Sequence, residues 1–337
     1  MTNRSPSNAP DSKPQVEHSS AATVAAALSR VFRNRSPERT LRLAAALGRS
    51  YARIGLPRVR EARLNLQLAF PGLSQGERDA LLVESFANLG QSLAEISLLQ
   101  GPNRDALFGK VELEGEEHVD AILESGTGAI VATAHFGAWE LCGAAFAARG
   151  YPVTSVYRPR EDTALDRLVA SWRSESGMEI VATGTTAGVG VVRALKRGRF
   201  VVMLLDQNAR RGEGVFVPFF GELACTRSGP AQLAMKLGVP ILPVFFHRLP
   251  GGGHVARVGA PLELELEPSG GDDAVAGAVK RNVALINRAI ETAIRRDPAQ
   301  WMWAHRRFRT RPPGSEAIYP PSRGLFRWLR HRLRRKR

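Results

Sequence analysis

The spacing of apolar residues changes along this chain near residue 101. Between residues 21 and 100 they recur every three or four positions, as in Phe86, Leu89 and Leu93, which is typical of amphipathic helices. Beyond residue 101, short apolar runs alternate with amphipathic stretches. Strands that alternate with helices indicate an α/β fold, with a mostly parallel central sheet flanked by helices and preceded by a helical region.

Local signals place the ends of several elements. Pro37 behind Ser36 predicts the first turn of one helix, and Ser74 with Glu77 predicts a capping box at the start of another. Strands are expected at 111–114, 129–134, 153–156, 178–181, 201–205, 241–246 and 255–258. Helices are expected at 116–124, 139–149, 165–174, 189–196, 230–237 and 274–295.

These patterns divide the chain into four expected parts. Residues 1–20 are rich in Ser, Pro, Asn and Asp and predict a disordered leader; a helical region over 21–100 and an α/β core over 101–310 follow. Residues 311–337 form a basic amphipathic tail. A membrane span is not expected, because the most apolar stretch, 128–148, contains His135 and Glu140.

The net positive charge of the chain predicts negatively charged partners. It carries 47 Lys and Arg against 32 Asp and Glu, a net charge of +15. In the tail, Leu325, Leu329 and Leu333 form a helical stripe between arginines, a pattern typical of helices in a lipid interface. A second basic region with interleaved apolar residues covers 30–63. The alternative interpretation is a solvated tail and a helix packed on the core; no nucleic-acid motif is present, so nucleic acid is not an expected partner.

Several kinds of chemistry find no support in the sequence. The two cysteines, Cys142 and Cys225, are too few for a disulfide framework or a zinc site and are interpreted as reduced, buried thiols. The chain has no Gly-x-Ser-x-Gly elbow, no phosphate loop ending in Gly-Lys-Ser/Thr, and no Gly-x-Gly-x-x-Gly after a strand. We therefore expect neither a cofactor nor a metal.

The sharpest candidate for chemistry is a histidine directly after a predicted strand. His135 follows the apolar run 129–134, and α/β sheets place their sites at the carboxyl ends of parallel strands. Glu140 can reach His135 only if the histidine lies on the turn before the helix that carries the glutamate, and Gly137 permits such a turn. A carboxylate on one imidazole nitrogen would leave the other free to take a proton from a substrate hydroxyl. A structural histidine beside a helix is the alternative.

Other features are weaker by themselves. Asp206 follows another predicted strand, and its position is as consistent with a turn residue or helix cap as with a functional residue. The apolar segment 215–221 is broken by Pro and Gly and leads toward a helix N-terminus, so it can line an acyl groove or hold an anion. The run Trp301-x-Trp303-x-His305 indicates either a basic aromatic patch near a membrane or core packing.

Taken together and in order, these pieces resemble the lipid A biosynthesis acyltransferases, the lauroyl and myristoyl transferase branch of the lysophospholipid acyltransferase superfamily. The resemblance runs from about Leu41 to Phe308. Its matching pieces are Asn65-Leu with Phe70-Pro71 and Ser74-x-x-Glu77-Arg78, His135-x4-Glu140, Tyr157-Arg-Pro159, Arg173, Asp206-Gln207, Val215 to Gly221 with Thr226, Gly238-x-Pro-x-x-Pro243, and Trp301-x-Trp303-x-His305-Arg.

The resemblance implies acyl transfer from an acyl carrier protein thioester, or from acyl-CoA, to a hydroxyl of a membrane glycolipid, with a lipid A precursor favoured. It implies His135 as general base and Glu140 as its orienting carboxylate, with Arg173 and Asp206 at further functional positions. Arg173 would bind acceptor phosphate or support oxyanion charge. The implied substrate-binding residues are Arg158, Gln207, Phe219, Phe220, Thr226 and Pro240.

The implied partners are an acidic carrier protein or acyl-CoA, an anionic lipid acceptor and a membrane surface. Both an acidic carrier and a phosphorylated lipid suit a protein of net charge +15. The implied location is the cytoplasmic face of the bacterial inner membrane, bound peripherally. Three alternatives stay open: an acyltransferase of another lipid such as mannosylated phosphatidylinositol, a thioesterase or hydrolase that uses water, and a non-catalytic basic protein of the membrane surface.

Overall fold

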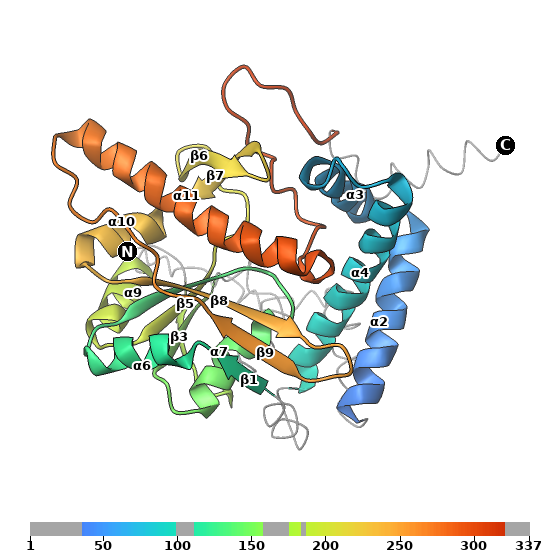
Figure 1. Ribbon diagram of the computed structural model, residues 1–337, viewed down its shortest axis with the longest axis horizontal. Helices are drawn as coiled ribbons and strands as arrows, with labels where there is room; N and C mark the ends of the chain where they lie inside the picture. Colours follow the sequence, from blue (N-terminus) through green and yellow to red (C-terminus); the bar gives the residue numbers. More distant parts are fainter. Residues whose placement is uncertain (1–35, 99–110, 158–174, 183–186, 321–337) are drawn as a thin grey trace, which may run out of the picture.

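The computed structural model describes residues 36–98, 111–157, 175–182 and 187–320 (Figure 1). The expected leader over 1–20, the end of the basic tail over 321–337 and the expected helix over 165–174 lie outside these residues.

A seven-stranded sheet forms the centre of the fold. Its strand order is β1-β9-β8-β2-β5-β3-β4, and every neighbouring pair is parallel except β8 and β9. The mostly parallel sheet predicted from the sequence is therefore confirmed. The strands are β1 (Val111–Glu114), β2 (Ala129–Thr133), β3 (Val153–Tyr157), β4 (Glu179–Ala182), β5 (Phe200–Leu204), β8 (Ile241–Arg248) and β9 (His254–Val258).

Helices cover both faces of this sheet because its central strands are apolar on both sides. All five residues of β2 are buried. Ala129 and Val131 pack in one core cluster and Ile130 and Ala132 in another, since successive side chains of a strand point to opposite faces. Figure 1 shows α11 on the upper side of the sheet and α6 and α7 on the lower side. The helices are α6 (Glu116–Glu124), α7 (Trp139–Ala148), α9 (Ala187–Lys196), α10 (Gly229–Leu237) and α11 (Asp272–Arg296), with a 3-10 turn η1 (Pro298–Gln300).

The segment from 214 to 227 forms an antiparallel hairpin that the sequence pattern did not predict. Strands β6 (Gly214–Phe219) and β7 (Glu222–Arg227) are joined by Phe220 and Gly221, both with positive φ of 50° and 80°. A two-residue loop with two positive φ angles matches the twist of a hairpin. Pro218 made the segment look like a broken apolar run, but it is exposed on a two-stranded ribbon, where a missing N–H costs little.

Three helices, α2 (Pro37–Ile54), α3 (Pro57–Ala69) and α4 (Gln75–Leu98), stack against one side of the α/β part (Figure 1). Their predicted starts are confirmed: Ser36 accepts a hydrogen bond from the Arg39 N–H, and Ser74 and Glu77 form a reciprocal capping box. In the described part of the chain, no helix has the length and apolar character that crossing a bilayer requires.

A buried charge network joins α4 to the sheet. Glu95 accepts two hydrogen bonds from the guanidinium of Arg248, at 2.6 and 2.9 Å, and His254 Nε2 lies 2.9 Å from the same carboxylate. Burial alone would raise the pKa of Glu95, but Arg248 and His254 outweigh it and lower that pKa to about 2. The stability that this carboxylate contributes is present above about pH 4 and is lost as the pH falls toward about 2.

Removing one partner of this network should leave a buried charge without compensation. We expect Arg248→Met to lower the free energy of unfolding by about 3–5 kcal/mol, measured by urea denaturation. The matched control is Arg257→Met on the neighbouring strand, where the partner Glu114 is 54% exposed and the loss should stay below about 1 kcal/mol. Equal losses in the two variants would contradict this account.

Candidate active site

His135 lies on a tight turn between β2 and α7, as the sequence predicted. Gly137, in the middle of that turn, has φ of +55°, and a Cβ at this position would lie 1.8 Å from the carbonyl oxygen of Phe246. Only glycine fits both the conformation and the space. The turn therefore holds the imidazole at the carboxyl end of the central strand, the edge where open α/β sheets build their sites.

The imidazole is held by a carboxylate from the next strand. Asp206 follows β5, which is paired with β2, and its Oδ1 lies 2.8 Å from His135 Nδ1. Its Oδ2 accepts hydrogen bonds from the His135 backbone N–H at 3.0 Å and from Trp301 Nε1 at 2.8 Å. Burial opposes ionisation of this carboxyl, but the imidazole and the hydrogen bonds lower the pKa of Asp206 well below its usual range. His135 and Asp206 are called the dyad below.

The other imidazole nitrogen faces the amide of Gln207. The Nε2 atoms of His135 and Gln207 are 3.2 Å apart. Because an ionised Asp206 only accepts hydrogen bonds, Nδ1 carries the proton and Nε2 accepts one from the amide. The bare nitrogen of a neutral imidazole is the atom that can take a proton from a substrate, and the Gln207 amide marks where a hydroxyl can approach it.

The C-terminal strap, defined as residues 300–310, ties these parts together. The Met302 N–H donates to the His135 carbonyl at 3.0 Å, and the Gly137 N–H donates to the Gln300 carbonyl at 2.8 Å. His305 Nε2 accepts from the Asn208 N–H at 3.0 Å. Burial lowers the pKa of His305 to about 4, so this ring stays neutral and able to accept. The strap therefore bonds both to the turn that carries His135 and to the segment after β5 that carries Asp206.

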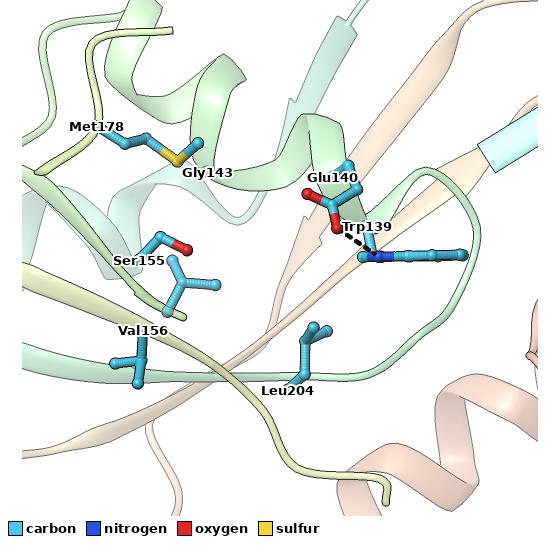
Figure 2. Close-up of a pocket in the computed structure, with 8 residues that line it drawn as sticks. Trp139, Glu140, Gly143, Ser155, Val156, Met178 and Leu204 are labelled. Carbon is cyan, nitrogen blue, oxygen red and sulfur yellow. Dashed lines mark hydrogen bonds between the residues drawn. The ribbon is translucent and has the colours of Figure 1, made fainter. Parts of the chain in front are cut away.

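The dyad differs from the pair that the sequence predicted. The family resemblance implied Glu140 as the orienting carboxylate of His135, whereas the carboxylate on Nδ1 is that of Asp206. Glu140 Oε1 accepts a hydrogen bond from Trp139 Nε1 at 3.1 Å and lines a cavity of about 30 Å³ between α7 and the strands β3 and β5. Figure 2 shows this carboxylate on α7 above Leu204. Asp206 rather than Glu140 bonds to the imidazole because β5 lies beside β2 in the sheet, which brings the residue after β5 next to His135.

Three of the predicted substrate-binding residues belong to the interior. Phe219 and Phe220 pack edge-on with ring centroids 5.0 Å apart, and Phe219 lies 5.6 Å from the ring of Trp301. Thr226 is 2% exposed and bonds to Asn287 on α11 and to the Arg307 guanidinium. These residues pack against or bond to buried residues of the strap, namely Trp301, Trp303 and Arg307, and are not exposed to solvent.

The remaining predicted residues are not brought to the dyad by the described structure. Pro240 precedes β8, whose Ile241 pairs with Ile130, so it lies about 15 Å from His135, near the opposite end of β2. Arg158 and Arg173 lie outside the described residues.

Sequence reasoning missed the part played by Trp301. Of the two interpretations of the 301–308 run, core packing is correct: Trp301 and Trp303 are 1% and 2% exposed, with ring centroids 4.6 Å apart. The hydrogen bond from Trp301 to Asp206 has no local signal, because 95 residues separate the partners. Among the described residues no group of His, Cys, Asp and Glu side chains suits a metal ion.

A histidine held by a buried carboxylate at the carboxyl ends of parallel strands is an arrangement that can transfer a proton, and α/β enzymes place their sites at this edge of the sheet. Comparison with known proteins gives the reaction class. The family model of the bacterial lipid A biosynthesis acyltransferases matches residues 10–310. The chain belongs to this family and is an acyltransferase.

Individual relatives agree with this assignment. The chain is 31% identical to the lipid A biosynthesis lauroyltransferase of Escherichia coli (strain K12), over 82% of this chain and 88% of the relative. It is 25% identical to the lipid A biosynthesis myristoyltransferase of the same strain, over 82% of both chains. It is also 29% identical to the phosphatidylinositol mannoside acyltransferase of Mycobacterium tuberculosis (strain ATCC 25618 / H37Rv), over 61% of this chain and 66% of that relative.

The Trp301 hydrogen bond can be tested with a variant that keeps an aromatic ring beside Trp303. Trp301→Phe removes the donor to Asp206, and the ring volume that is lost with it is matched in the control. Loss of a hydrogen bond to a charged acceptor costs about 1.5–3 kcal/mol, so we expect acyltransferase kcat to fall about tenfold to a hundredfold. Trp303→Phe is the matched control, because its indole N–H bonds to the Pro298 carbonyl. An equal loss of kcat in both variants would contradict a specific role for Trp301.

Proposed function

We propose that this acyltransferase moves a fatty acyl chain from an acyl carrier protein thioester, or from acyl-CoA, to a hydroxyl of a membrane glycolipid. The favoured acceptor is a lipid A precursor, and His135 is the general base. The observation that supports this most directly is the dyad geometry, in which Nδ1 is held by Asp206 at 2.8 Å and Nε2 is left as an acceptor. No nucleophilic serine is needed, because the acceptor alcohol attacks directly.

The proposed reaction starts with the acceptor hydroxyl in place of the Gln207 amide at His135 Nε2. The base takes the hydroxyl proton as the oxygen attacks the thioester carbonyl, and Asp206 stabilises the imidazolium that forms. Collapse of the tetrahedral intermediate breaks the carbon–sulfur bond, and the imidazolium returns its proton to the sulfur. The products are the acylated lipid and the free thiol of the donor.

Glu140 and Arg173 complete the proposed site. Through its bond to Trp139, Glu140 orients an indole ring whose centroid lies 5.5 Å from that of His135. We therefore propose Glu140 as a positioning residue for the imidazole. For Arg173 we keep the role that the family resemblance implies, contact with acceptor phosphate or with oxyanion charge.

The choice of acceptor rests on the relatives. Lauroyl and myristoyl transferases of lipid A biosynthesis support a lipid A precursor. The Mycobacterium tuberculosis relative acts, by its name, on a phosphatidylinositol mannoside, and it supports a mannosylated phospholipid as the second candidate. Both acceptors are anionic, as is an acidic carrier protein, and each suits a net charge of +15.

The proposed location is the cytoplasmic face of the bacterial inner membrane, with peripheral attachment. Support comes from one face of α2, on which Leu47, Tyr51 and Ile54 are 49%, 37% and 51% exposed. Arg39 and Arg53 of the same helix are also exposed and lie to one side of this stripe. Apolar side chains bordered by arginines are typical of a helix lying in an anionic lipid interface.

The activity is tested with purified protein in detergent or vesicles, acyl carrier protein thioesters and a tetra-acylated lipid A precursor, with product masses read directly. We expect acyl addition that requires the lipid and falls at least about a thousandfold in His135→Ala, because the base is removed. Thioester loss without lipid would indicate a hydrolase. Transfer only to mannosylated phospholipids would replace the acceptor, and silence with all donors and acceptors would favour a non-catalytic membrane protein.

The membrane surface is tested by vesicle sedimentation with anionic lipids. We expect Leu47→Ser/Ile54→Ser to weaken binding about tenfold or more, since two exposed apolar side chains no longer enter the interface. The matched control is Leu123→Ser/Val275→Ser, which removes side chains 42% and 43% exposed on α6 and α11. Equal weakening by the control would contradict a specific role for α2.

A further inference from the structure

Arg307 is a buried arginine whose described hydrogen-bond partners are all neutral. It is 0% exposed. Its guanidinium donates to the Cys225 carbonyl at 3.0 Å and to Thr226 Oγ1 at 2.5 Å, and its Cζ lies 4.9 Å from the Phe219 ring centroid. Its Nε has no hydrogen-bond partner in the described structure. Burial lowers the pKa of Arg307 to about 10, which still leaves it charged near neutral pH.

A purely structural role does not explain this residue well. A buried cation without a bonded carboxylate is destabilising, and an apolar side chain of similar volume usually stabilises such a position better. Hydrogen bonds to neutral acceptors and the face of Phe219 offset only part of that cost. The charge itself therefore needs a function.

The strap places this charge behind the dyad. The Phe219 ring contacts both the Arg307 guanidinium and the Trp301 ring, and the Trp301 indole bonds to Asp206. Aromatic rings and buried backbone fill this region, so solvent screens the charge poorly. The attraction of Asp206 acts on Arg307, partly opposing the effect of its burial.

We propose that Arg307 is the fixed counter-charge of the dyad, a positioning residue that acts on Asp206 and His135 through its electric field. This inference rests on the proposed general base. In the resting enzyme the positive Arg307 balances the negative Asp206. When His135 takes the hydroxyl proton, the site gains one positive charge while the attacked carbonyl oxygen gains one negative charge, so the site stays balanced.

The backbone of the turn 135–138 has no N–H group available to bond the negative oxygen that forms when the thioester carbonyl is attacked. All four backbone N–H groups from His135 to Ala138 already donate to protein acceptors, namely Asp206, Ala134, Gln300 and Phe246. They do not form an oxyanion hole in this arrangement. A positive charge built into the strap meets the same electrostatic need from behind.

Several described elements bring charged and titratable groups to the region of the imidazole. Glu140 stands on α7, Asp206 follows β5, and His305 and Arg307 come from the strap. His305 stays neutral, as shown above. The strap holds two further arginines, but Arg306 pairs with Glu61 at 2.6 Å and Arg309 is exposed. Arg307 is therefore the buried positive charge of the strap.

The test compares Arg307→Gln, which removes the charge, with Arg307→Lys, which keeps it. The readout is the pKa of His135, followed by NMR of the imidazole in the free protein and assigned with His135→Ala. We expect Arg307→Gln to raise this pKa by about half a unit to one unit, because losing a nearby positive charge favours the imidazolium. Arg307→Lys should keep it within about 0.2 unit. The acid limb of kcat/KM should move with it.

Thr226→Val is the matched control, because it removes a hydrogen-bond acceptor of Arg307 without changing any charge. An unchanged His135 pKa in folded Arg307→Gln, or an equal rise in Thr226→Val, would overturn the proposal. If Arg307→Gln does not fold, the double variant Arg307→Gln/Asp206→Asn decides. Folding of the double variant supports charge compensation, and failure of both makes Arg307 a structural residue. Since the NMR readout needs no substrate, a shifted pKa without transferase activity would sink the proposed function alone.

Discussion

The two oxygens of Asp206 carry the interaction on which the site depends. Oδ1 bonds to the His135 imidazole, and Oδ2 receives the His135 backbone N–H and the Trp301 indole. One buried carboxylate therefore joins the end of β5, the end of β2 and the C-terminal strap. A carboxylate in the interior stays ionised only with such donors, so the charge and the geometry maintain each other.

A second buried charge, that of Arg248, also holds the turn that carries His135. Arg248 Nη2 donates to the Gly137 carbonyl at 3.1 Å and also pairs with Glu95 on α4. The turn that carries His135 is thus held from one side by the strap and from the other by a buried ion pair that reaches the helical region. Buried polar networks of this kind keep a reactive side chain in one rotamer and one tautomer.

Much of the fold was predictable because its signals are local. The bounds expected for α6 agree with the structure, and the starts of α2 and α4 follow from capping residues next to the helix. The hairpin β6–β7 was missed because Pro218 and Gly221 look like breaks in an apolar run. In the fold α11 packs against this hairpin, and its Asn287 donates to the Pro218 carbonyl. Glu140 was expected as the partner of His135 from the family motif His135-x4-Glu140, whereas Asp206 is brought to the imidazole by the pairing of β2 with β5.

The sequence by itself determined the α/β class, the position of His135 at a strand end and the resemblance to an acyltransferase family, since periodicity, glycine placement and ordered motifs are properties of neighbouring residues. Only the tertiary structure decided which carboxylate bonds to the imidazole, which nitrogen faces the Gln207 amide and which buried side chains of the strap, Trp301 and Arg307, lie near the dyad. These facts depend on strand order and on contacts across 70 residues or more, such as the 71 between His135 and Asp206. Hydrogen bonds and charges act through space, so no local pattern records them.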